Sequence, residues 1–470
     1  SGKGSEYTSN SVFGRVIYSY ADRYLFQANI RHDGSSRFAK GYRWGTFPSF
    51  SAGWVMSEEK FMKSLNWDWL SFLKLRGSWG ILGNERIGDD YFPYIALMSF
   101  GNSLFYMADG SVVSDKTARP AILAVEDITW ETTTSTDFGL DANFFNNRLQ
   151  FHFDYYWKQT KDMLLKIEIP YFMGYNNPNT NAGKMSTHGY DIELAWNDRI
   201  GDLQYGVNVN FSDFLSKIDY MNDGEQISNG KIKRAGVLFN EYYGYVCDGI
   251  YQTQEEVNNS ARTSTTVTVG DLKYRDISGP DGVPDGIISP EYDRVPLGNS
   301  LPRFQYGGTF NASYKGIDFS IAFQGIGKQN SYLSTAMVQP LRDNYGSVPS
   351  IIEGKYWSPF NTAEENLSAR YPRLSNVSKS NNYATSSFWM FNGSYFRLKN
   401  LTLGYTLPET WTQKAGIDRV RFYISGSDLF CLSNFPDGWD PEMGASSYPI
   451  TTSLVMGLQA VSYTHLTLPT

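Results

Sequence analysis

The sequence predicts an all-β fold: an antiparallel, up-and-down β-barrel whose strands cross a membrane. Three observations carry this prediction. Aromatic residues make up 16% of the 470 residues and 43 residues are glycine, a balance that favours strands over helices. Apolar and polar residues alternate over stretches of about ten residues, which is the pattern of a strand with two different faces. Short and long connections alternate between these stretches, as is typical of outer-membrane barrels.

The clearest alternation runs from Arg148 to Lys158. One face carries Leu149, Phe151, Phe153, Tyr155 and Trp157, and the other carries Gln150, His152, Asp154, Tyr156 and Lys158. A lysine or arginine that faces lipid at the bilayer midplane costs about 2–4 kcal/mol. We therefore expect the aromatic stripe to face lipid and the polar stripe to face a water-filled lumen. The alternative is a water-soluble sheet with one buried face.

The same pattern places thirteen strands along the chain. They lie at 12–20, 23–33, 44–55, 72–81, 133–145, 148–160, 186–197, 203–214, 302–314, 317–327, 394–406, 419–427 and 450–460. The short connections are 21–22, 146–147, 198–202 and 315–316, with 56–71 and 407–418 somewhat longer, and the long ones are 34–43, 82–132, 161–185, 215–301, 328–393 and 428–449. Short turns on one side and long loops on the other distinguish an outer-membrane barrel from a soluble sandwich.

The number of strands predicts an incomplete barrel. In lipid every unpaired backbone group costs several kcal/mol, so membrane strands have to close on themselves. Transporter barrels with a plugged lumen have about 22 strands, and on that count roughly nine strands and the plug would precede Ser1. The chain starts without a methionine or a signal peptide. We therefore interpret residues 1–463 as a partial barrel domain that contains the C-terminal strands.

One strand departs from the alternation. In the stretch 394–406, Arg397 and Lys399 share their parity with Leu401, Leu403 and Tyr405. Either a β-bulge shifts the phase of this strand, or the two cations lie above the hydrocarbon, among the lipid headgroups.

Composition and motifs exclude several other classes of protein. The net charge of −7 argues against nucleic-acid binding, which needs a basic face. No apolar run approaches the roughly 20 residues of a membrane helix. The histidines at positions 32, 152, 188 and 465 lack the spacing of metal ligands, and no Gly-x-Ser-x-Gly motif is present. We therefore expect a protein that is not an enzyme.

Several stretches of the chain are distinctive as a set: Gly393–Pro408, Val420–Phe430 followed by Asp440-Pro-Glu442, Arg31–Phe38 and Leu75–Gly80. They resemble the SusC/RagA family of TonB-linked outer-membrane proteins. The resemblance extends from Arg31 to about Leu458, nearly the whole chain, and its stretches are specific as a set rather than one by one.

The resemblance implies a function and several partners. It implies import of oligosaccharides or peptides through a plugged barrel in the bacterial outer membrane, in contact with outer-membrane lipid. It also implies a SusD-like surface lipoprotein that captures the ligand, and a TonB complex that acts through an N-terminal part absent from this sequence. The C-terminus differs from the family, because members usually end the last strand on an aromatic residue. Tyr463 fits that position, and residues 464–470 are interpreted as a non-native tail.

The acidic loop between Asp276 and Gly286 is a candidate metal site. Hard cations such as Ca²⁺ and Mg²⁺ prefer several oxygen ligands on a tight loop that contains glycine. Asp276, Ser278, Asp281 and Asp285 supply such oxygens, with Glu291 or Asp293 to complete the shell. Ca²⁺ is the cofactor that this site would hold. The alternative is a Pro/Gly turn with solvated carboxylates.

Aromatic residues in the long loops are candidate ligand-binding residues. Sugar rings stack on aromatic faces, and the residues that we single out are Tyr242, Tyr243, Trp357, Trp389 and Trp439. The alternative is that these side chains pack the loops or contact the lipoprotein partner.

Two other classes of function remain open from the sequence. One is a soluble or surface all-β protein that binds glycans, or a glycoside hydrolase, which would need two carboxylates facing each other across a cleft. The other is an open porin without a plug, which the resemblance disfavours.

Overall fold

The computed structural model describes residues 6–462, apart from 89, 121, 223, 335–338, 342–347, 349, 444–446 and 449. The predicted tail at 464–470 lies outside these residues. Helices are short in the described part of the chain: α1 (Lys60–Ser64), α2 (Gln254–Asn259), α3 (Ala363–Ser368), α4 (Lys379–Asn382) and α5 (Glu409–Thr412), with single 3₁₀ turns η1 (Met56–Glu58), η2 (Tyr171–Met173), η3 (Ser350–Ile352), η4 (Ser387–Trp389) and η5 (Gln413–Ala415). In the same residues, no helix has the length and hydropathy of a membrane span.

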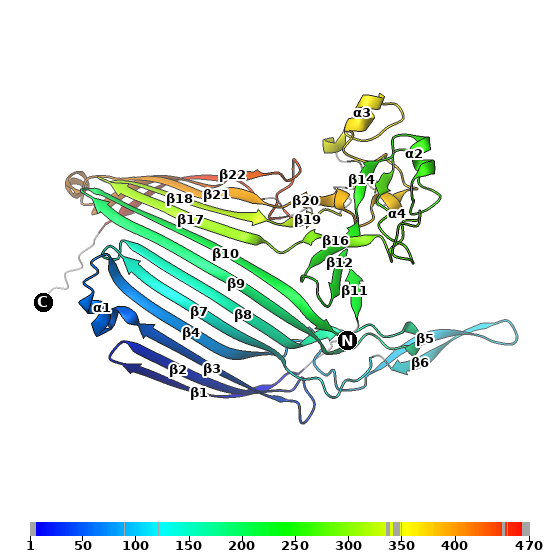
Figure 1. Ribbon diagram of the computed structural model, residues 1–470, viewed down its shortest axis with the longest axis horizontal. Coiled ribbons are helices and arrows are strands. Elements are labelled where there is room, and N and C mark those ends of the chain that lie inside the picture. Colours follow the sequence, from blue (N-terminus) through cyan, green and yellow to red (C-terminus); the bar gives the residue numbers. More distant parts are fainter. Residues whose placement is uncertain are drawn as a thin grey trace. The chain divides into compact units, whose positions relative to one another are not determined.

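Long antiparallel strands dominate the fold and follow one another in chain order (Figure 1). They are β1 (Ser9–Tyr20), β2 (Tyr24–Ser35), β3 (Trp44–Val55), β4 (Leu70–Asn84), β7 (Glu131–Phe144), β8 (Leu149–Lys166), β9 (Asn179–Ile200), β10 (Leu203–Met221), β17 (Arg303–Tyr314), β18 (Ile317–Lys328), β21 (Tyr395–Thr406), β22 (Arg419–Ser433) and β23 (Ser453–Val461). Within the described residues these are thirteen strands in one sheet. The all-β, up-and-down prediction and the position of every predicted strand are confirmed.

Several strands extend well beyond their predicted ends, among them β8, β9 and β10. These strands run to Lys166, from Asn179 and to Met221, several residues beyond the alternating stretches at 148–160, 186–197 and 203–214. Alternation shows only where the two faces meet different surroundings, so the sequence does not mark strand residues beyond that zone.

The chain divides into two compact units. The first comprises Ser1–Ile192, Phe214–Gln226 and Arg234–Leu238, and the second comprises Glu193–Asp213, Ile227–Lys233 and Phe239–Thr470. The first unit contains β1 to β4, β7 and β8, and the second contains β17, β18 and β21 to β23.

In the first unit the strand register brings apolar residues into rows across the sheet. One such row is Tyr18, Phe26, Ala52, Gly77, Phe138 and Tyr155, each opposite the next on the neighbouring strand. The row is exposed, with Phe138 at 57% and Phe26 at 43% relative exposure. The next row is polar and contains Gln27, Ser51, Ser78 and Asp137. The alternation therefore produces one apolar face and one polar face, as predicted.

The second unit repeats this arrangement. Its apolar row is Val207, Phe310, Ile321, Leu401, Gly426 and Leu454, again paired strand by strand. Leu454 at 73% and Val207 at 36% relative exposure show that this face, too, is open in the described residues.

A β-bulge at Lys399 explains the strand whose phase conflicted with its neighbours. The register of β21 shifts between Leu398 and Asn400 against β22, where Asp428 has the positive φ of 51°. Against β18, Ala322 is opposite Asn400 and Phe323 is opposite Leu398, so Lys399 is an extra residue on β21. This extra residue inverts the alternation and moves Arg397 to the polar face, opposite Gln324. Lys399 Nζ lies 2.7 Å from the Asp428 carboxylate. Of the two alternatives that the sequence left open, the bulge is confirmed.

The predicted short turns are tight. The connection between β1 and β2 has three residues, since Tyr20 is opposite Tyr24. Ala21 and Asp22 in this connection both have positive φ, at 53° and 51°, as the central residues of a type I′ turn require. Lys315 and Gly316, the two residues between β17 and β18, also have positive φ, at 45° and 89°. A Cβ on Gly316 would lie 2.6 Å from the Thr406 carbonyl oxygen, so this turn also needs glycine for space.

The long connections fold into small sheets that the sequence did not predict. β5 (Met98–Tyr106) and β6 (Val112–Pro120) form a hairpin within 82–132. Residues 215–301 and 328–393 contain β11 (Glu225–Ser228), β12 (Lys231–Arg234), β13 (Glu241–Tyr245), β14 (Cys247–Ile250), β15 (Leu272–Tyr274), β16 (Arg294–Asn299), β19 (Asn330–Tyr332) and β20 (Met390–Asn392). β13 pairs with both β12 and β16, β14 pairs with β15, and β19 pairs with β20.

Most of the buried apolar clusters lie in these connections rather than on the sheet. One contains Leu333, Ile352, Tyr371, Trp389 and Phe435, a second contains Tyr245, Leu272, Tyr274 and Ile288, and a third contains Tyr251, Val257 and Val267. A sheet face needs a second layer to bury its side chains. In the described residues these three clusters instead form within the loops and hold them together.

Candidate functional site

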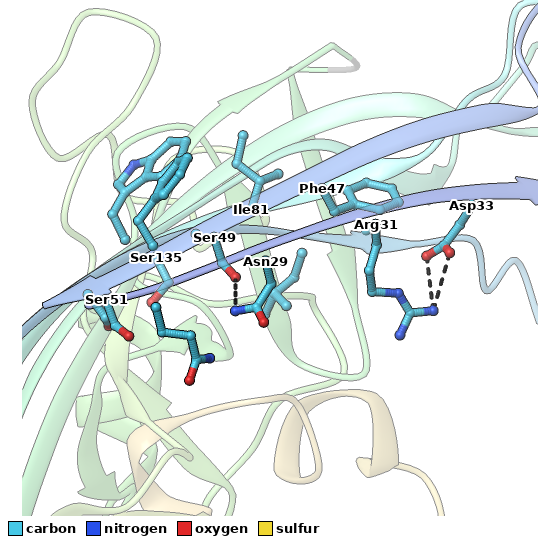
Figure 2. Close-up of a pocket in the computed structure, with 15 residues that line it drawn as sticks. Asn29, Arg31, Asp33, Phe47, Ser49, Ser51, Ile81 and Ser135 are labelled. Atoms are coloured by element: carbon cyan, nitrogen blue, oxygen red, sulfur yellow. Dashed lines mark hydrogen bonds and ion pairs between the residues drawn. The ribbon is translucent and has the colours of Figure 1, made fainter. Parts of the chain in front are cut away.

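The polar face of the first unit contains a pocket of about 500 Å³ (Figure 2). The polar side chains that line it come from neighbouring strands: Gln27, Asn29, Arg31, Asp33, Ser49, Ser51, Ser78 and Ser135. The apolar side chains of Phe47, Phe50, Trp79, Ile81 and Leu82 complete the lining. The Asn29 amide donates to Ser49 Oγ at 3.2 Å, and Arg31 pairs with Asp33 at 3.2 Å. Figure 2 shows Arg31, Asp33 and Phe47 at one end of this group, with Ser51 at the other. The pocket offers hydroxyl, amide and charged groups to a polar ligand.

A charged network lies on the same polar face. Arg76 Nη1 is 2.5 Å from the Asp154 carboxylate and Arg76 Nε is 3.1 Å from Asp141. Lys74 and His152 also contact Asp141, at 3.9 Å and 3.0 Å. Register explains the cluster, because Arg76 is opposite Gly139, and Gly139 is opposite Asp154. The missing side chain of Gly139 leaves room for the Arg76 guanidinium, which lies 2.4 Å from where a Cβ would be.

In the second unit a buried arginine joins a strand to a loop. Arg397 of β21 is 3% exposed, and its guanidinium lies 2.6 Å from Asp440 and 2.5 Å from Glu442. Gln324 of β18 donates to Glu442 at 3.1 Å. The loop after β22 is therefore held against the polar ends of β18 and β21.

The two longest connections share a buried polar centre at Asp271. Asp271 is 0% exposed and accepts hydrogen bonds from Arg373 at 2.7 Å, Ser378 at 2.8 Å and Asn382 at 3.0 Å. The backbone N–H of Thr268 also donates to this carboxylate, at 3.0 Å. Because the three side-chain donors lie more than a hundred positions along the chain from Asp271, this carboxylate ties the connection 215–301 to the connection 328–393.

Most of the predicted ligand-binding aromatics lie inside the loops. Trp389 is 0% exposed and its indole N–H donates to the Asn382 carbonyl oxygen at 2.8 Å. Tyr242 and Tyr243 are each 8% exposed and Trp357 is 9% exposed. Trp439 packs partly buried against the cluster that contains Trp389. In this arrangement the four buried rings pack the loops, and a ligand-binding role for the five aromatics stays a prediction.

Burial also changes the acid–base properties of loop residues. It raises the pKa of the Tyr242 hydroxyl above its usual range and lowers the pKa of Lys231, whose ammonium lies 5.1 Å from the centre of the Tyr242 ring. Burial raises the pKa of the Cys247 thiol to about 11. Both Cys247 and Cys431 are free thiols, and Cys247 does not have the lowered pKa of a reactive nucleophile.

The structure does not gather the predicted metal ligands into one shell. Asp293 is 0% exposed, and its carboxylate accepts from the backbone N–H groups of Ile277 and Ser289, both at 2.7 Å. Asp276 accepts from Gly286 N–H and Asp285 accepts from Ile287 N–H. Across the described residues, no group of three or more histidine, cysteine or acidic side chains is arranged to hold a metal ion. These carboxylates instead stabilise the turns of the loop.

The metal site stays a prediction, and metal analysis of purified protein checks it. Bound calcium or magnesium in the wild type that is lost in Asp281→Ala would support the site, because Asp281 carries none of the turn-stabilising hydrogen bonds described above. Equal metal content in the two proteins would count against it.

Sequence reasoning missed the residues that form the charged centres. Asp271 and Arg373 lie in irregular segments where no periodicity marks them. Asp440 belongs to a stretch that carries the family resemblance, but the sequence did not indicate its ion pair. Arg397 had a signal: its parity conflicted with that of its strand, and such conflicts often mark bulges or functional positions. The pocket residues of β2 to β4 were predictable as a polar face but not as a pocket.

Comparison with known proteins identifies the relatives of this chain. Residues 1–425 match the family model described as TonB dependent receptor-like, beta-barrel. TonB-dependent receptor P3 of Formosa agariphila is 31% identical over 484 residues, covering 95% of this chain and 45% of the relative. TonB-dependent receptor SusC of Bacteroides thetaiotaomicron is 31% identical over 466 residues, covering 95% of this chain and 43% of the relative.

Solved structures agree on the fold. The RagAB peptide transporter superposes with a TM-score of 0.78 at 24% identity, covering 97% of this chain and 47% of that chain. Its 'closed-closed' state gives a TM-score of 0.77. This chain spans less than half the length of each of these relatives.

Proposed function

Because this chain belongs to the family of TonB-dependent receptor-like β-barrels, we propose that it forms the wall and outer loops of a bacterial outer-membrane importer for oligosaccharides or peptides. The observation that carries the proposal is the two-faced sheet. One face presents exposed rows of aromatic and aliphatic side chains, and the other presents ion pairs and hydrogen-bonding groups. Lipid outside and water inside a tube suit these two faces.

The polar face suits the passage of a hydrated oligomer. The hydroxyls and amides around Asn29, Ser49 and Ser78 offer hydrogen bonds of moderate strength. Such groups interact with sugars and with peptide backbones alike. The relatives named SusC and the RagAB peptide transporter support the importer assignment.

The proposal includes two partners. A SusD-like lipoprotein would pair with the outer loops, as the RagAB pairing supports, and a TonB complex would act through a segment upstream of this chain, as the family name supports. The rival functions from the sequence, a soluble glycan-binding protein, a hydrolase or an open porin, gain no support from these relatives, whose family is that of transport receptors.

Mass spectrometry of ligands that co-purify with the full-length receptor and its lipoprotein decides the substrate class. A ladder spaced by sugar residues would assign oligosaccharides, and a set of short peptides would assign peptides. Release of the protein from membranes by salt alone, without detergent, would contradict the importer proposal altogether.

A lysine placed on either face of β8 tests the assignment of the two faces. We expect Phe153→Lys to be about 2–4 kcal/mol less stable than Phe153→Ala in lipid vesicles, because the charge enters hydrocarbon. Gln150→Lys should differ from Gln150→Ala by less than about 1 kcal/mol, because the added charge stays in water. Urea unfolding in vesicles measures all four variants. Equal penalties at the two positions would mean that Phe153 does not face lipid.

A further inference from the structure

The connection between β3 and β4 carries an exposed aromatic patch that the importer proposal does not explain. We define the patch as Phe61, Leu65, Trp67, Trp69 and Phe145, each between 44% and 53% exposed. The first four lie in the connection 56–69, which contains η1 and α1, and Phe145 begins the turn after β7. All of these residues belong to the first unit.

A buried carboxylate holds this connection in place. Glu59 is 9% exposed and accepts from the Tyr24 hydroxyl at 2.5 Å, the Trp54 indole N–H at 3.1 Å and Arg23 at 3.0 Å. Glu59 is the N-cap residue of α1 and Leu65 is its C-cap residue. Phe61 and Leu65 are four residues apart and therefore lie on the same side of the helix. The Phe61 ring lies 6.5 Å from the Trp54 ring. These contacts therefore hold the segment in a defined conformation against the sheet.

The aromatic rings continue from the connection onto the apolar face of the sheet. Trp67 stacks on Trp69 with ring centroids 5.3 Å apart, and Trp69 stacks on Phe144 at 5.8 Å with an interplanar angle of 3°. Phe144 is opposite Leu149, the first residue of the stripe predicted to face lipid. The backbone N–H of Phe145 donates to the Trp69 carbonyl oxygen at 2.8 Å, which ties the two turns together.

We propose that the segment 56–69, with Phe145, is an interfacial anchor that lies in the headgroup region of the bilayer, with phospholipid as its partner. The inference rests on the proposed function, which gives the apolar face its lipid. Tryptophan favours this depth because its ring is apolar while its indole N–H finds hydrogen-bond acceptors among the headgroups. A short amphipathic segment with lysines on its other side, here Lys60 and Lys63, lies flat in the same zone.

The patch is continuous with the apolar face of the sheet, which favours lipid over a protein as its partner. Trp54 and Phe144 belong to the apolar rows of the sheet, so any surface that covers those rows also reaches the patch. The connection between β21 and β22 shows the same feature independently, because its helix α5 carries Trp411 at 63% exposure. Both connections belong to the predicted set of short connections, in which they are the two longest.

Depth-dependent quenching tests the anchor in the full-length receptor reconstituted in phosphatidylcholine vesicles. Cys247 and Cys431 are first replaced by alanine. Single cysteines are then introduced by Leu65→Cys and Trp67→Cys, and labelled with a small fluorophore. Phe151→Cys on the apolar stripe and Gln150→Cys on the polar stripe are the matched controls. The quenchers are a headgroup spin label and a spin label near the end of the acyl chain, and only variants that keep heat-resistant migration in detergent gels are compared.

We expect the headgroup label to quench the probes at positions 65 and 67 at least about twofold more than the deep label does. The probe at position 151 should show the opposite order, and the probe at position 150 should respond to neither. If the probe at 151 is quenched and those at 65 and 67 are not, the patch faces water or a protein, which overturns the anchor but leaves the importer standing. If the probe at 151 is not quenched, the importer proposal fails and the anchor fails with it.

Discussion

Replacing Arg397 by alanine is expected to destabilise the folded protein by about 3–5 kcal/mol. The guanidinium is 3% exposed and pairs with both Asp440 and Glu442. Removing it leaves two carboxylates, 15% and 20% exposed in their side chains, facing each other without a counter-ion. Breaking a buried pair by removing one partner costs far more than the net worth of the pair, because the remaining charge stays desolvated.

The exposed ion pair of Arg31 and Asp33 is the matched control on the polar face. Arg31 is 59% exposed in its side chain, so Arg31→Ala should cost under about 1 kcal/mol. Urea unfolding of the two variants in lipid vesicles measures the difference. Arg397→Lys should recover part of the loss, because it restores the charge without the bidentate geometry. An Arg397→Ala protein as stable as Arg31→Ala would show that the loop after β22 is not held by this arginine.

Replacing Asp271 by alanine is expected to loosen two loops that are far apart in the sequence. Four hydrogen-bond donors converge on this carboxylate, and its loss leaves the Arg373 guanidinium without its anionic partner. Loss of a charge partner in such a buried network costs about 3–5 kcal/mol. Because the donors come from residues 268 and 373–382, the connections 215–301 and 328–393 should open together.

Hydrogen exchange and limited proteolysis report on this coupling. We expect amides of β14 and β15 and amides of α4 to lose protection to the same extent in Asp271→Ala, while the long strands keep theirs. Asp248→Ala is the control, since Asp248 also pairs with an arginine, Arg275, at a site where the two side chains are 31% and 58% exposed. It should leave protection nearly unchanged. Loss of protection confined to one connection in Asp271→Ala would contradict the coupling.

The long strands were predictable because their two faces meet different surroundings. Leu149 to Trp157 alternate with polar residues, and the structure places the two sets on opposite faces of β8, with Phe138 opposite Tyr155 and Asp137 opposite Tyr156. A slip of one residue would invert every side chain, so this alternation specifies the register. The bulge at Lys399 is the exception that alternation also revealed, as a conflict of phase.

The loops were not predictable in the same way. Trp389 and Tyr242 stand in irregular sequence, and nothing local distinguishes a ring that stacks on a ligand from one that fills a core. Their burial depends on partners such as Asn382 for Trp389 and Tyr332 for Tyr242. The acidic loop posed the same problem. Asp293 accepts hydrogen bonds from the backbone N–H groups of Ile277 and Ser289, and the sequence does not show which backbone groups a carboxylate will contact.

The sequence by itself determined the class of fold, the positions of thirteen strands and which stripe of each strand is apolar. These features are periodic and local, so each strand can be recognised from its own residues alone. Only the tertiary structure decided that Arg397 faces Asp440 and Glu442, that Asp271 joins two distant connections, and that the loop aromatics form cores. Such contacts join residues far apart in the chain, and their free energy depends on burial, which no local pattern encodes.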